Sequence, residues 1–90
     1  MTPPKLLLVE WLDHCSRDGW NSLEEAGGMT PVTIITVGWV VKETETFLTL
    51  AGTADYSNDD DVHFNSLFLI VKSCITSRKE IDDRGQFVLL

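Results

Sequence analysis

Basic residues are scarce in this chain. Of its 90 residues only seven are Lys or Arg, against fourteen Asp or Glu, which gives a net charge of −7 at pH 7. Because clustered Lys and Arg supply most of the nonspecific affinity for DNA and RNA, nucleic acid is not expected as a partner. An acidic surface instead favours solubility, or docking onto a basic protein surface.

Cysteines and long apolar runs are also few. Cysteine occurs only as Cys15 and Cys74. No secretory signal with an apolar core follows a basic start, so both thiols are expected to be free in the cytoplasm. The apolar run Leu6-Leu7-Leu8-Val9 has only four residues and is far too short to span a membrane. The sequence therefore predicts an intracellular protein without membrane contact.

Motifs that carry catalysis are missing. The chain has no glycine-rich phosphate loop, no serine nucleophile elbow and no metal-binding helix motif. Residues 13–15, Asp-His-Cys, place three reactive side chains in a row. Neighbours on a strand point to opposite faces, however, so His14 is not expected to activate Cys15. We predict that the protein is not an enzyme and that it binds no cofactor.

Two patterns fall short of a metal site. The acidic loop 55–61 has oxygen ligands at alternate positions, but it lacks the glycine and the bidentate glutamate of a helix-loop-helix calcium loop. The two histidines and two cysteines are residue types that bind zinc, yet they do not occur in the close pairs that zinc sites use. We expect a solvated loop at 55–61 and no bound metal.

What the chain does contain is strand-forming sequence. The longest run of β-branched and aromatic residues, 32–42, carries no charge before its last position. Such side chains suit a packed strand. Residues 5–13 place Leu7, Val9 and Trp11 on one face, with a short helix as the alternative because Leu and Glu form helices well. The predicted strands are 5–13, 32–42, 46–53, 63–71 and 75–81.

The long connection at 14–31 contains a helix signal. Ser22 and Glu25 match a capping box, in which each side chain accepts a hydrogen bond from the other residue's backbone. Gly27-Gly28 follows and is expected to end the helix in a left-handed conformation after about one turn. The connection is therefore expected to be structured and to fold over one end of the core.

Five short strands in this order predict a small closed barrel, since closure removes the exposed edges of a sheet. A brief turn at 72–74 before the last strand resembles SH3-like and Sm-like barrels. The expected fold is an all-β, five-stranded SH3-like or Sm-like barrel, one domain over 1–90 with residues 82–90 left unassigned. Its predicted core residues are Trp11, Val37, Gly38, Trp39, Val41, Leu48, Leu50, Leu69 and Ile75.

Tryptophan is the residue type that best indicates binding. Three tryptophans in 90 residues is a high number, and tryptophan is favoured at interface hot spots. Trp20, in a polar loop, is equally consistent with a lid on the core and with a contact surface. We predict that Trp20 anchors a partner and that an acidic cluster steers its association. The acidic residues of this predicted site are Asp59, Asp60 and Asp61.

Three motifs carry a resemblance to a known group of proteins. They are Val9-Glu10-Trp11-Leu12-Asp13, Trp20 with Ser22-Leu23-Glu24-Glu25-Ala26, and Val37-Gly38-Trp39-Val40-Val41-Lys42-Glu43. Together they resemble short uncharacterised accessory proteins of tailed bacteriophages, over about residues 9–81. The family has an Ile-Pro-Arg turn where this chain has Val71-Lys72-Ser73-Cys74-Ile75, without proline. The resemblance implies a phage protein in the cytoplasm of the infected bacterial host, and it implies no particular activity.

Three functions are consistent with these observations. The first is a non-enzymatic accessory protein that binds and modulates a host or phage protein. The second is an oligomeric sponge that sequesters a host immune signalling nucleotide, with Lys72, Arg78 and Lys79 contacting phosphate. The third is a minor structural component of the virion. The apolar segment 87–90 favours a homo-oligomer, because exposed apolar area promotes self-association.

Overall fold

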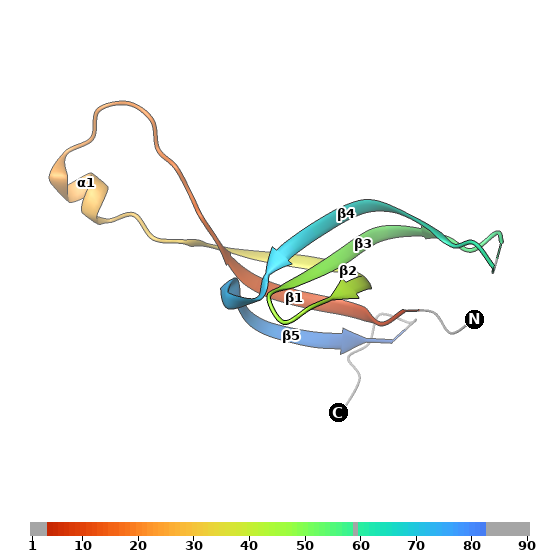
Figure 1. Ribbon diagram of the computed structural model, residues 1–90. Coiled ribbons are helices and arrows are strands. Elements are labelled where there is room, and N and C mark those ends of the chain that lie inside the picture. The colour runs from red at the N-terminus through yellow and green to blue at the C-terminus, as the bar shows by residue number, and fades with distance from the viewer. Residues whose placement is uncertain (1–3, 59, 83–90) are drawn as a thin grey trace.

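The computed structural model describes residues 4–58 and 60–82, which form one antiparallel sheet, one short helix and one 3₁₀ turn (Figure 1). The predicted tail, except Asp82, lies outside the described residues. All five strands lie within two residues of their predicted bounds. The elements are β1 (Leu6–Asp13), α1 (Leu23–Gly27), β2 (Val32–Glu43), β3 (Phe47–Asp55), β4 (His63–Val71), η1 (Lys72–Cys74) and β5 (Ile75–Ile81).

The strands are arranged in the order β4-β3-β2-β1-β5. Each strand pairs antiparallel with its neighbours, so β4 and β5 are the two edges of the sheet. The predicted all-β class is confirmed, and so is the short turn between the last two strands. The predicted closure is not found, because no pairing joins β4 to β5 in the described part of the chain. Neither helical segment described is long and apolar enough to span a membrane.

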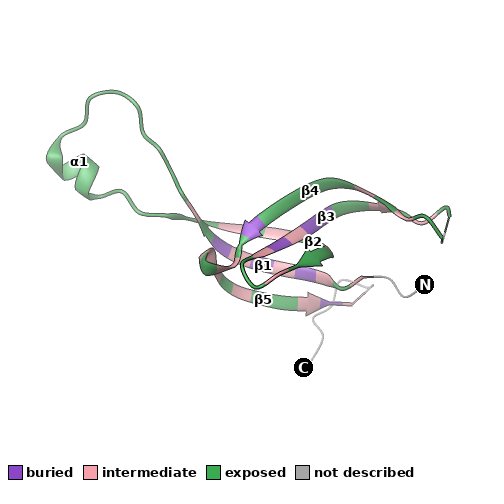
Figure 2. Ribbon diagram, in the orientation of Figure 1, coloured by how far each residue is buried: buried purple, intermediate pink, exposed green. Residues whose placement is uncertain are grey.

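One face of the sheet carries the core. Leu7, Val9 and Trp11 alternate along β1 and are buried, as predicted, and they lie opposite β2 residues of the same face. On β3 and β4 the paired residues Leu48 and Ile70 are nearly inaccessible to solvent. The core is therefore a single layer on the inner face of the sheet, shown as buried segments in Figure 2.

The sheet curls around this layer. The ring centroids of Trp11 on β1 and Phe68 on β4 lie 5.4 Å apart, although two strands separate β1 from β4 in the sheet. Register shifts interrupt the β1–β5 pairing at Glu10/Trp11 and the β2–β3 pairing at Val40/Lys42. Such irregularities increase the local twist and bend a strand. Side chains thus reach across a sheet whose backbone remains open.

Some of the predicted core residues lie on the outer face. Val37, Val41 and Leu69 are each 40% or more exposed, which corrects their assignment to the core. Val37 and Leu69 alternate with inward-facing neighbours, and no element among residues 4–58 and 60–82 covers their face. Trp39 and Ile75 are half-buried. The buried members of the predicted set are Trp11, Gly38, Leu48 and Leu50.

Gly38 on β2 lies close against the backbone of β3. A Cβ at this position would lie 2.8 Å from the Ala51 carbonyl oxygen and 3.0 Å from the Leu50 Cβ. Glycine inside a strand often marks such a close approach of two backbones. The missing side chain at Gly38 therefore allows the strands to pack tightly at the centre of the core.

We expect Gly38→Ala to reduce the free energy of unfolding by about 1–3 kcal/mol, because overpacking displaces the β3 backbone. Urea denaturation monitored by tryptophan fluorescence measures this change. Gly27→Ala is the matched control, since a Cβ there meets no atom within 4 Å. Equal free energies of unfolding for the Gly38 variant and the control would show that the β3 backbone moves aside without destabilising the fold.

Candidate functional site

The most exposed apolar side chains lie on an arm, residues 14–31, that connects β1 to β2. The arm projects away from the sheet with α1 at its far end (Figures 1 and 2). Every residue from 14 to 31 is exposed; Trp20 is fully accessible and Leu23 is 90% exposed. The prediction that this connection folds over the core is wrong. Trp20 is available for contact and is not a lid.

The arm has internal order despite its exposure. The Glu25 amide donates to Ser22 Oγ at 3.1 Å and the Ser22 amide donates to Glu25 Oε1 at 3.3 Å, which confirms the predicted capping box. Gly28 caps the other end in a right-handed conformation instead of the expected left-handed one. At the base of the arm, the Cys15 thiol donates to the Thr30 carbonyl oxygen at 3.2 Å. These bonds restrain the segment that presents Trp20.

The acidic loop between β3 and β4 is solvated and makes local turns. Asp55 accepts a hydrogen bond from the Ser57 amide at 2.9 Å, and bonding to Ser57 lowers the pKa of the Asp55 carboxyl. Asp61 lies 3.2 Å from the His63 Nε2 at the start of β4. Asp60 is exposed, and Asp59 lies outside the described residues. In the described ranges, no group of three or more His, Cys, Asp or Glu residues is placed to share a metal ion.

Trp20 and the acidic loop do not form one site. The described chain is elongated, with extents of 56 × 28 × 25 Å. The arm lies at one end and the β3–β4 loop at the other (Figure 1). A partner contacting Trp20 would meet Asp60 and Asp61 only by extending along the whole molecule. The predicted binding residues therefore belong to two separate surfaces.

The predicted phosphate-binding cations do not gather into one cluster. Lys72 and Arg78 both bind Glu43: Lys72 Nζ lies 2.6 Å from Glu43 Oε2, and Arg78 donates to both carboxylate oxygens at 2.9 and 3.1 Å. Lys79 follows Arg78 on β5, and successive residues of a strand point to opposite faces. The carboxylate of Glu43 neutralises part of the positive charge of Lys72 and Arg78, which makes this pair of cations a poor phosphate site.

The Glu43 cluster links distant parts of the chain. It joins the end of β2 to η1 and to β5, across sequence separations of about thirty residues. Hydrogen bonds from Arg78 and Lys72 lower the pKa of the Glu43 carboxyl from 4.5 to about 2. The same pairing raises the pKa of the Arg78 guanidinium. The cluster is best explained as a structural clamp.

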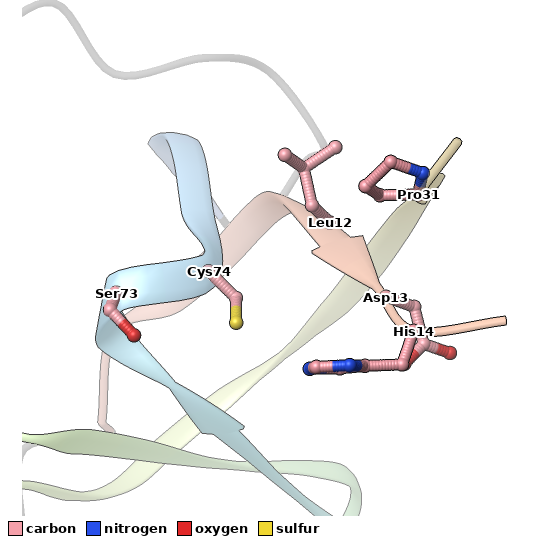
Figure 3. A pocket seen from close by; sticks show the side chains of 6 residues that line it. All are labelled: Leu12, Asp13, His14, Pro31, Ser73 and Cys74. Atoms are coloured by element: carbon pink, nitrogen blue, oxygen red, sulfur yellow. The ribbon is translucent and has the colours of Figure 1, made fainter. Parts of the chain in front are cut away.

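A hollow of about 200 Å³ lies beside the end of β1. Figure 3 shows its lining residues: Leu12, Asp13, His14, Pro31, Ser73 and Cys74. His14 and Cys74 are the reactive types here, but the described structure contains no hydrogen bond between them or to a third orienting group. Nucleophilic catalysis requires both bonds. The hollow is mainly apolar and offers no catalytic arrangement.

A second, adjoining hollow of about 300 Å³ extends along the end of β4 from Phe68 to Val71. Here the sheet edge carries exposed apolar side chains: Leu67 is 59% exposed and Leu69 is 55% exposed. Sequence reasoning missed this surface because it assigned Leu69 to the core. The apolar run alone gave no signal, because only the strand order shows that β4 has a pairing partner on one side only.

Comparison of the chain with protein-family models, with curated proteins and with solved structures finds no match.

The Glu43 clamp predicts an acid-sensitive contribution to stability. Because folding lowers the pKa of Glu43 from 4.5 to about 2, the clamp stabilises the fold above pH 4.5 and is lost as the pH falls toward 2. The difference in unfolding free energy between the wild type and Glu43→Gln should therefore shrink over this range. Urea titrations at successive pH values measure it. Glu45→Gln, in the neighbouring turn, should show no such trend; a constant difference for Glu43→Gln would contradict the clamp.

Proposed function

We propose that this protein is a non-enzymatic binding module that docks on another protein through its arm. The observation that carries the proposal is the complete exposure of Trp20 at the end of an internally hydrogen-bonded segment. Tryptophan is enriched at interface hot spots because one side chain removes a large apolar area from water on binding. A solvent-exposed tryptophan contributes little to the folding of this chain, so a role in binding accounts for it better.

The geometry of the arm supports the same function. Leu23, on the first turn of α1, adds a second apolar side chain close in sequence to Trp20, and α1 buries none of its own residues. The capping box holds this turn in place before any partner arrives. Preorganisation of this kind reduces the entropy lost on binding. The arm therefore has the properties of a docking element.

The proposal also includes a phage origin and an SH3-like or Sm-like fold family. The three motifs described above support a phage accessory protein that acts on a host or phage protein in the infected cell. The strand order and the 3₁₀ turn before β5 support an SH3-like or Sm-like barrel in an open form. Because Lys72 and Arg78 bind Glu43, a structural role explains these two residues better than a phosphate site for nucleotide capture does.

Trp20→Ala should weaken binding to the partner by about thirtyfold, the loss typical of a hot-spot residue. The partner is identified by pull-down from infected host lysate with tagged wild-type protein, and its affinity is measured by calorimetry. Val41→Ala, which also truncates an exposed side chain, is the control and should bind normally. Unchanged affinity of the Trp20 variant, with its fold intact by circular dichroism, would disprove docking through the arm. Recovery of the protein in purified virions would favour a structural component.

The acidic loop is expected to act on the rate of association. Reversing Asp60 and Asp61 to lysine should slow association with a basic partner at low salt and leave dissociation nearly unchanged. Stopped-flow measurements at two ionic strengths test this. Because Trp20 lies at the other end of the molecule, its variant should instead accelerate dissociation. An equal effect of both changes on dissociation would show that the two surfaces contact the partner together.

A further inference from the structure

The two edges of the sheet differ in chemistry. β5 carries three consecutive charged residues, Arg78, Lys79 and Glu80, whereas β4 has no charged residue and no proline from Phe64 to Val71. Edge strands expose unpaired backbone donors and acceptors, and soluble proteins usually protect them with charges, prolines or bulges. β5 has this protection. On β4 only Ser66, with a φ of 58°, distorts the strand, so nothing in the described part of the chain protects residues 67–71.

We propose that β4 pairs with β4 of a second copy, antiparallel and about a two-fold axis near Leu69, to join two sheets into one. In this arrangement Leu67 of one copy lies opposite Val71 of the other, and the two Leu69 side chains face each other. Residues opposite one another in an antiparallel pair share a face of the sheet. The contact is thus aliphatic and self-complementary, as a two-fold interface requires.

The charge distribution permits a second copy at this edge. Each copy carries a net charge of −7, so two copies repel unless their contact surface excludes acidic residues. Residues 64–71 meet that condition. Pairing β4 with β5 of another copy would instead place the apolar edge beside Arg78, Lys79 and Glu80. That arrangement desolvates charges without adding partners for them.

Part of the area that a dimer needs is exposed along this edge. Leu67, Leu69 and Val71 on β4 are each at least half exposed and lie on the outer face. Their accessible parts amount to on the order of 300 Å², the size of a large apolar patch on an ordinary monomer. A stable interface removes roughly 800 Å² per partner, and the paired strand backbones with the hollow beside Phe68 supply further area.

Single cysteines test the pairing in the full chain after Cys15 and Cys74 are changed to serine. Under mild oxidation, Leu69→Cys should form disulfide-linked dimers. Leu67→Cys and Val71→Cys should react weakly alone but cross-link efficiently when the two proteins are mixed. Ile35→Cys, on the outer face of an interior strand, is the matched control and should stay unlinked. Cross-linking of the control as efficient as that of Leu69→Cys would overturn the proposal.

The mass in solution gives an independent test. Light scattering should show a dimer of two 10.1 kDa chains for the wild type. Leu69→Lys should weaken the dimer by at least about tenfold through charge repulsion across the axis, with an unchanged circular dichroism spectrum. Ile35→Lys should leave the strand pairing in place. A wild-type monomer at micromolar concentration, or a ring or polymer larger than a dimer, would disprove two-fold pairing.

Discussion

The structure depends on one constraint: a single sheet must enclose its own core, because no helix or second sheet of the described chain covers either face. The chain meets this constraint by curling, which brings Trp11 of β1 against Phe68 of β4 across two intervening strands. Gly38 allows the central strands to approach, and the Glu43 clamp ties the end of β2 to η1 and β5. The inner face is thereby buried while the backbone remains open along β4 and β5.

An enclosed inner face leaves an uncovered outer face, and this has consequences beyond stability. Both faces of β2 and of β4 carry apolar side chains, and those of the outer face are exposed to water in the described chain. Apolar residues on both faces of a strand are typical of strands covered on both sides. The arm adds a third exposed apolar element at a distance from the other two. Accessible apolar surface of this extent supports the proposed pairing with a second copy and the proposed docking through the arm.

Local features of the sequence predicted local structure well. Apolar and β-branched residues between turn signals located the strands, the alternation on β1 identified Leu7, Val9 and Trp11 as one face, and the Ser22–Glu25 pattern located the helix start. The predictions that failed were those that depend on contacts between residues distant in the sequence. Alternation separates two faces but does not say which of them is covered, so Val37 and Leu69 were placed in the core. Whether β4 meets β5, and whether Trp20 folds back, depends on contacts between distant residues that no short pattern encodes.

The same distinction between local and nonlocal features applies to the two candidate surfaces, the arm and the edge of β4. Trp20 was singled out because tryptophan is favoured at interface hot spots, although its polar loop was equally consistent with a lid on the core and with a contact surface. The apolar edge of β4 gave no such signal, since an identical run in an interior strand would be ordinary core. Its meaning comes only from the strand order, which places β4 beside one neighbour instead of two. Leu67, Leu69 and Val71 would be ordinary core residues in a covered interior strand, but on this edge strand they form an exposed surface. In a sheet that curls without closing, the strand order therefore decides which apolar residues are free to contact another molecule.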